Sequence, residues 1–194
     1  MPNWATTTYT LKGKDARKVF NLIEKHLNDN TDTNKNWLGR VVEDLNNGEC
    51  NVYSRGWIND YEVVDDECIK LHCETAWSEC NEWRKFLESK FKDLKIYYVT
   101  EECGMDVYIT NDPDYPYMFL LDTDVCCCEE YETEEDMLKS ACLYIGRDEV
   151  STRKQVEEWC EHLPYGVAEA KVAEAYVGDA PLHKSTCSPD RGSA

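Results

Sequence analysis

Residues Ile69–Asp106, IKLHCETAWSECNEWRKFLESKFKDLKIYYVTEECGMD, decide the fold class of this chain. Apolar and polar residues alternate over Ile69–Glu74, which is the period-two pattern of a strand with one buried face. Ser78 then suits the N-cap of a helix, because four apolar side chains follow it at spacings of three and four: Trp83, Phe86, Leu87 and Phe91. Alternation resumes over Leu94–Thr100. The stretch predicts a strand, a helix and a second strand in succession.

The residues before this stretch predict the other half of the same fold. Thr6–Leu11 is rich in β-branched residues and predicts a strand, and Asp15 is placed to cap the helix that follows. One face of that helix gathers Val19, Leu22, Ile23, His26 and Leu27. Asn28–Asn36 then predicts a polar loop, Leu38–Leu45 a short helix and Cys50–Tyr53 the beginning of the second strand.

The elements in order read β-α-β-β-α-β, which predicts an α+β fold of the ferredoxin-like, split βαβ type. We expect an antiparallel sheet with both helices on one face, and further strands at Val107–Ile109 and Tyr117–Leu121. The layer between the helices and the sheet should bury Phe20, Ile23, Trp83, Phe86 and Leu87.

The composition changes after Leu121. Residues 122–136, DTDVCCCEEYETEED, hold eight carboxylates and no basic residue. Thr133 suits the N-cap of a helix that ends near Gly146, and Ser151 or Thr152 begins a second one, after which residues 167–177 predict a short third helix.

These changes predict three parts of the chain. A ferredoxin-like domain covers residues 1–125, and an acidic segment with a C-terminal helical annex covers residues 126–177. Residues 178–194 have the small, polar composition of a disordered tail.

Four short motifs point to a known family. The chain opens with MPNWATTTYTLKG, and TAWSECNEW, FKDLKIYYV and EECGMDV follow within residues 75–107. Together they resemble the YubB-type ferredoxin-like domain family, small proteins of plasmids and phages. The matching positions are Pro2, Asn3, Trp4, Thr75, Trp77, Asp93, Leu94, Glu102, Gly104 and Met105. Glu79 and Cys80 replace two prolines that are usual in the family, and the resemblance ends near residue 121. It implies a fold and transfers no catalytic residues.

The chain is strongly acidic, with 39 Asp and Glu against 21 Lys and Arg and a formal charge of −18 at pH 7. This charge disfavours direct binding to nucleic acid or to anionic membranes and favours a basic protein partner. The simpler interpretation is that acidity keeps a small protein in solution. With no apolar run of about 18 residues and no secretory signal, we expect a cytoplasmic protein without a membrane span.

The eleven cysteines do not predict a disulfide framework, because no export signal is present. Cys126–Cys128 offers metal ligands together with nearby carboxylates, Asp122, Asp124 and Glu129, and with His72 and Cys73 as a remote second pair. Adjacent thiols lack the spacing of a zinc site, so a strand edge or a reactive exposed thiol is favoured. Asp122 and Asp124 could share a magnesium ion, but pairs of acidic residues are common in so acidic a chain and are weak evidence for a metal site. We predict no cofactor and no metal.

The histidines give little support to catalysis. His72 and Cys73 point to opposite faces of one strand, and Cys160 and His162 diverge on a helix. His26 suits the boundary of a helix core. No phosphate-binding loop, nucleophile elbow or zinc-protease motif is present. The sequence therefore favours a protein that is not an enzyme.

Aromatic residues next to acidic ones predict a binding surface. Trp57, in a predicted loop, and Tyr115, beside Pro116, suit anchors for a partner, although packing beneath its own loop is the simpler interpretation of Trp57. The predicted partner-binding residues are Asp122, Asp124, Glu129, Glu130, Glu132, Glu134, Glu135, Asp136, Trp57 and Tyr115.

Two functions follow from these predictions. In the first, which the family resemblance suggests, the protein inhibits a basic host defence effector by mimicking nucleic acid in a cationic channel. In the second, a small ligand or nucleotide binds the sheet face, where Arg55 and Arg147 meet its anionic groups, and an enzyme acting on that ligand is a variant of this hypothesis. Basic residues clustered around a pocket distinguish the second function from the first. The sequence does not indicate an oligomeric state.

Overall fold

The computed structural model describes residues 3–102, 107–123, 129–147, 152–162 and 170–178. The chain divides into two compact units, residues 1–102 and residues 103–178. This division lies earlier in the chain than the one after residue 125 that the sequence suggests. The predicted tail beyond residue 178 lies outside the described residues.

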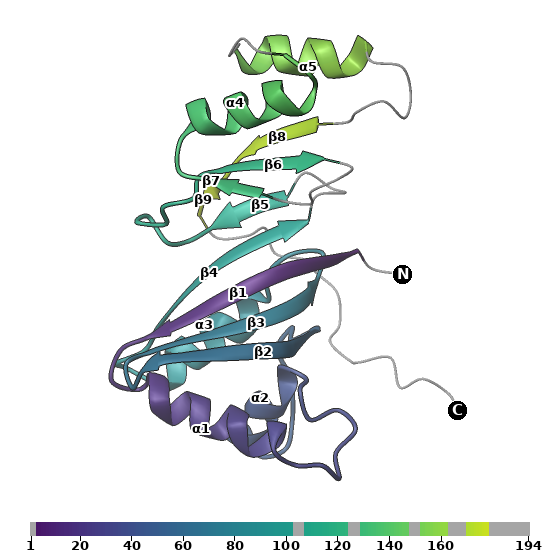
Figure 1. Cartoon of the computed structure of the whole chain (residues 1–194). Helices are drawn as coiled ribbons and strands as arrows, with labels where there is room; N and C mark the ends of the chain where they lie inside the picture. Colours follow the sequence, from purple (N-terminus) through teal and green to yellow (C-terminus); the bar gives the residue numbers. More distant parts are fainter. Residues whose placement is uncertain (1–2, 103–106, 124–128, 148–151, 163–169, 179–194) are drawn as a thin grey trace, which may run out of the picture. The chain divides into compact units, whose positions relative to one another are not determined.

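The first unit runs through β1 (Trp4–Lys12), α1 (Ala16–Leu27), α2 (Gly39–Leu45), β2 (Gly56–Asp65), β3 (Cys68–Ala76), α3 (Asn81–Lys90) and β4 (Lys95–Glu102). Its strands lie in the order β2-β3-β1-β4, and all neighbouring pairs are antiparallel (Figure 1). β3 separates β1 from β2, and β1 separates β3 from β4, so each βαβ unit is split by a strand of the other. The predicted α+β fold class of ferredoxin-like type is confirmed.

One face of this sheet is covered and the other is open. The covered face buries alternate residues of β1, β3 and β4: Ala5, Thr7, Tyr9, Leu11, Ile69, Leu71, Cys73, Ile96, Tyr98 and Thr100. The ring of Phe20 in α1 lies 4.8 Å from that of Tyr61, and the ring of Trp83 in α3 lies 5.0 Å from that of Tyr9. Tyr61 and Tyr9 both lie opposite Leu71, so the two helices cover the same face, as predicted.

Four of the predicted core side chains are buried, namely Phe20, Ile23, Trp83 and Leu87. Phe86 is only half-buried, and a fully covered position on α3 belongs instead to Arg84. The sequence pattern did not predict a buried Arg84, because an arginine interrupts the apolar stripe on which the prediction of buried residues rests.

A buried polar cluster joins β1 to the start of α3. The Tyr9 hydroxyl accepts a 2.7 Å hydrogen bond from the Cys80 N–H and lies 3.5 Å from a carboxylate oxygen of Glu79. Glu79 pairs with Arg84 at 3.2 Å, and their side chains are 0% and 2% exposed. The Arg84 guanidinium also lies over the Tyr98 ring. Burial, more than the nearby Cys80 and Glu79, raises the pKa of Tyr9, so this hydroxyl keeps its proton.

The starts of both major helices differ from the predictions. The N-cap of α3 is Cys80, and Ser78 lies two residues earlier in a buried turn. The backbone at Trp77 has a positive φ of 72°, which delays the helix. Asp15 occupies the N-cap position of α1 without capping it through its side chain. Its carboxylate instead accepts the Asp93 N–H at 3.1 Å.

The predicted second strand is misplaced. Cys50–Tyr53 is irregular, because the Tyr53 N–H donates to the Glu82 carboxylate at 2.7 Å and ties this segment to α3. β2 begins at Gly56, where an added Cβ would lie 2.8–2.9 Å from Thr75, Glu74 and Leu38. The prediction that Trp57 lies in a loop is also wrong, because Trp57 belongs to β2.

The second unit contains β5 (Val107–Thr110), β6 (Phe119–Thr123), β7 (Glu129–Tyr131), α4 (Glu134–Tyr144), α5 (Arg153–His162), β8 (Ala170–Glu174) and β9 (Tyr176–Val177). β6 pairs antiparallel with β7 and β8, and β5 pairs parallel with β9. Beneath α4, the core gathers Leu121, Met137, Leu138, Ala141, Cys142 and Val156. The two further strands and the helix that starts after Thr133 are confirmed.

The predicted third helix over residues 167–177 is wrong. Its described part forms β8, paired with β6, and β9, paired with β5. Alanine and glutamate are good helix formers, but intrinsic propensity is a weak preference, and pairing with a distant strand overrides it.

The buried charge pair makes a prediction for stability. Replacing Arg84 with alanine leaves the Glu79 carboxylate without its buried counter-ion, so the free energy of unfolding should fall by about 3–5 kcal/mol in urea denaturation. The double variant Glu79→Leu, Arg84→Met removes both charges and should lose less. A loss below about 1 kcal/mol for the single variant would show that the pair is unimportant.

Candidate functional site

The second unit carries most of the negative charge of the chain. Residues 103–178 hold 18 Asp and Glu against five Lys and Arg, which accounts for −13 of the formal −18. Six of these carboxylates are exposed and close in sequence, and we call them the acidic surface: Glu129, Glu130, Glu132, Glu134, Glu135 and Asp136. All six were predicted to bind a partner.

Two elements present the acidic surface. Glu129 and Glu130 belong to β7, which pairs with β6. Glu134, Glu135 and Asp136 form the first turn of α4, where the helix dipole favours negative charge. The Thr133 hydroxyl accepts the Asp136 N–H at 3.2 Å and fixes this turn.

Tyrosines adjoin the acidic surface at Glu130. The Tyr115 hydroxyl donates to a carboxylate oxygen of Glu130 at 2.6 Å. The Tyr108 hydroxyl donates to the Tyr117 carbonyl at 2.6 Å and lies 3.2 Å from the same Glu130 oxygen. Tyr115 also packs edge-on against Tyr117, which is 40% exposed. Burial, followed by the Glu130 charge, raises the pKa of Tyr108, which therefore stays a donor. The structure thus brings together Tyr115 and Glu130, which were predicted separately, and adds Tyr108, which strand alternation alone does not mark as functional.

The remaining predicted binding residues are not among the six carboxylates of the acidic surface. Asp122 is part of β6, and Asp124 lies outside the described residues. Trp57 is half-buried in the first unit, where its ring packs edge-on against Trp4 at 5.0 Å. Arg55 stacks over the same Trp4 ring. Trp57 therefore has a packing role.

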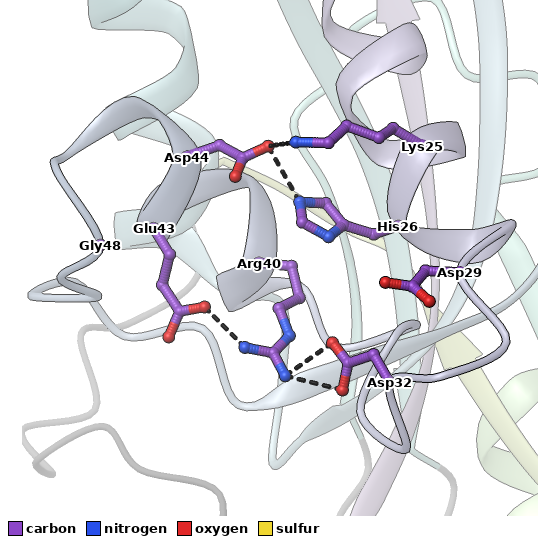
Figure 2. A pocket seen from close by; sticks show the side chains of 8 residues that line it. All are labelled: Lys25, His26, Asp29, Asp32, Arg40, Glu43, Asp44 and Gly48. Atoms are coloured by element: carbon purple, nitrogen blue, oxygen red, sulfur yellow. Dashed lines mark hydrogen bonds and ion pairs between the residues drawn. The ribbon is translucent and has the colours of Figure 1, made fainter.

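A charged pocket of about 560 Å³ lies in the first unit, between α1, α2 and the loop that joins them (Figure 2). It is lined by Lys25, His26, Asp29, Asp32, Arg40, Glu43, Asp44 and Gly48. No local pattern in the sequence indicates this pocket, because its residues are spread over two helices and a polar loop.

Ion pairs inside the pocket join its three walls. Arg40 of α2 pairs with Asp32 of the loop at 2.7 Å and with Glu43 at 2.8 Å. Asp44 of α2 pairs with Lys25 at 3.2 Å and with His26 at 3.0 Å, both on α1 (Figure 2). Each cation already faces a carboxylate of the protein, so the pocket fastens the loop to the helices.

Hydrogen bonds lower the pKa values of two pocket aspartates, Asp32 and Asp44. Burial opposes the ionised form of Asp44, but hydrogen bonds from Lys25 and His26 outweigh it, so the pKa of Asp44 is lowered. The Asn34 N–H is the main cause of the lowered pKa of Asp32, with Arg40 contributing. The loop is therefore stabilised by ionised acids.

Within the described residues, no group of His, Cys, Asp and Glu has the arrangement of a metal site. No disulfide is formed by Cys50, Cys68, Cys73, Cys80 or Cys142. Burial raises the pKa of Cys73 and of Cys80, which makes them poor nucleophiles. His72, on the other face of β3, lies 3.2 Å from the Thr8 hydroxyl. Cys126–Cys128 lies outside the described residues.

Comparison of the chain with known protein families, curated proteins and solved structures finds no match. The resemblance to YubB-type proteins therefore stays a prediction. None of the helices that the structure describes has the length and apolar character needed to cross a membrane.

The pocket predicts how stability depends on pH. The folded-state pKa values of Asp32 and Asp44 lie below the unfolded value of 3.8. Their contribution is therefore complete above that value and is lost as the pH falls through the lower folded-state values. Urea denaturation from pH 7 to pH 2.5 should show this loss. The Asp44→Asn variant should be less stable at pH 7 and lose less on acidification, whereas Glu49→Gln should follow wild type; equal slopes for all three would contradict the assignment.

Proposed function

We propose that the protein is a non-enzymatic binding protein whose acidic surface docks on a basic protein partner. Two observations support this proposal: the second unit carries −13 of the net charge, and six of its carboxylates form an exposed surface presented by a strand and a helix start. Like charges on one surface repel one another, and a cationic partner relieves that repulsion.

The aromatic residues add a second kind of contact. Tyr115 and Tyr117 adjoin Glu130, so a partner that approaches the carboxylates also meets two amphipathic rings. Tyrosine gives much contact area at small entropic cost and is common at interface hot spots. Charge then determines the rate of encounter, and the rings contribute to the lifetime of the complex.

The family resemblance extends this proposal to the biological partner. A phage or plasmid protein of this kind acts in the cytoplasm on a host defence effector that handles nucleic acid. Its acidic surface occupies the cationic channel and blocks the substrate, which is inhibition by mimicry of a polyanion.

A second candidate function uses the open sheet face, as one observation favours it. The Lys12 ammonium lies 4.9 Å and the Lys95 ammonium 5.9 Å from the centroid of the Tyr97 ring. Two cations beside an aromatic ring suit a small anionic ligand such as a nucleotide. Lys95 already pairs with Glu88 at 3.1 Å, which weakens this candidate.

Neutralising the acidic surface tests the first function. Glutamine at Glu129, Glu130, Glu132, Glu134 and Glu135 keeps size and hydrogen-bonding oxygens while it removes five charges. Tagged wild type should capture a basic protein from host lysate, and the variant should associate about tenfold more slowly at low salt, a difference that shrinks as salt rises.

A matched control removes five charges from the first unit, with glutamine at Glu24, Glu49, Glu67, Glu74 and Glu82. It should bind nearly as fast as wild type, because the altered charges lie outside the acidic surface. Equal association rates for both variants and wild type across the salt series would refute the docking surface. A small anionic molecule in the wild-type eluate, without a protein, would favour the sheet-face function.

A further inference from the structure

The outer edge of β2 is half occupied and half open. β2 is the outermost strand of the first unit's sheet (Figure 1). Residues 36–38 cover its first part: the Leu38 N–H donates to the Gly56 carbonyl at 3.0 Å and the Ile58 N–H to the Asn36 carbonyl at 2.8 Å. The backbone groups on the outer side of β2 can therefore receive an extended chain.

The open part follows directly. Every residue from Asn59 to Asp65 is exposed, and among the described residues no strand pairs with the outer side of this stretch. The Tyr61 N–H donates at 2.8 Å to the side chain of Asp60, so it points away from β3 and lies in the outer row. By the alternation of an antiparallel strand, the N–H and carbonyl of Val63 lie in the same row.

Two apolar side chains of this edge are left partly exposed. Tyr61 is 40% and Val63 39% exposed, although their partners on β3, Leu71 and Ile69, are fully buried. The Tyr61 ring already packs against Phe20 of α1. The apolar side chains of an added strand would therefore cover the exposed parts of Tyr61 and Val63.

The charges of this hairpin decide which chain can occupy it. Asp60 and Glu62 lie on the open face of the edge, and Asp65, Asp66 and Glu67 follow at its tip. The cations opposing them are Lys70, paired with Glu62 at 3.1 Å, and Arg17, paired with Asp66 at 2.9 Å. A second copy of the same edge would meet like charges, and the register shifts at Asn59 and Val64 further oppose self-pairing.

We propose that Asp60–Val63 is a docking edge for an extended segment of a partner protein in which apolar and basic residues alternate. The segment pairs antiparallel with β2, as every neighbouring strand of this unit does. Its apolar side chains lie beside Tyr61 and Val63, and its basic side chains lie beside Asp60 and Glu62. Backbone hydrogen bonds to Tyr61 and Val63 hold it, and the Tyr61 N–H exchanges the Asp60 carboxylate for a peptide carbonyl.

The test uses synthetic peptides and the full chain. A fluorescent, end-capped peptide Lys-Val-Lys-Val-Lys-Val-Lys is titrated with the protein and followed by fluorescence anisotropy. A peptide of the same composition in blocks, Lys-Lys-Lys-Lys-Val-Val-Val, controls for charge, and one with N-methylated valines controls for backbone hydrogen bonding. The alternating peptide should bind about tenfold tighter than either control, as expected for two backbone hydrogen bonds and a matched register.

Protein variants locate the site. Val63→Pro removes an outward N–H without breaking the pairing with β3 and should lose the preference for the alternating peptide. Glu62→Lys should weaken binding of the same peptide, and neutralising the acidic surface of the second unit should leave the preference unchanged. If Val63→Pro does not fold, the N-methylated peptide still decides the question. Equal affinity for all three peptides, or no binding of the alternating one, would overturn the docking edge.

Discussion

The hydrogen bond from the Cys80 N–H to the Tyr9 hydroxyl fixes the start of α3 on the central strand β1, and the packing of the first unit depends on this contact. Tyr9 lies on β1, which is paired on both sides, so its position is set by β3 and β4 together. The bond places the start of α3 over that strand, and the Trp83 ring then packs on the Tyr9 ring. The polar chain continues through Glu79 to Arg84, all of it in the covered layer. Such a buried network requires every polar group to have a partner, because an unpaired buried polar group lowers the stability of the fold.

The same constraint explains which parts of the fold were predictable. Alternation identified β1, β3 and β4 because each has one covered face, and the stripe of α3 followed for the same reason. Ser78 failed as an N-cap because a left-handed Trp77 and the bond to Tyr9 move the helix start to Cys80. Contacts between residues 71 positions apart have no local signature in the sequence. β2 was misplaced for a related reason, since most of its length is exposed and shows no alternation of burial.

The exposure of charged residues was predictable where they are close in the sequence, and their clustering was not predictable where the fold brings distant residues together. The acidic surface is a run in the sequence, so its exposure on β7 and α4 was foreseeable. The hydrogen bond from the Tyr115 hydroxyl to Glu130 joins residues 15 positions apart and was not foreseeable. The charged pocket was missed altogether, because Lys25 and Asp44 belong to different helices that only the fold brings together. Charge composition thus predicts surfaces, whereas pockets depend on tertiary structure.

The acidic composition of the chain gives two surfaces whose carboxylates act in different ways. On the second unit, carboxylates lie on exposed side chains and act at a distance, so in the proposed function they affect how fast a basic partner arrives. Along β2, carboxylates alternate with Tyr61 and Val63 at an open backbone edge, so they act at contact and select the sequence that can pair. An edge that exposes apolar side chains invites aggregation unless charges and bulges protect it. Asp60 and Glu62 meet that need, and in the proposed complex they also select basic strands, so protection from self-association and choice of partner would arise from the same residues.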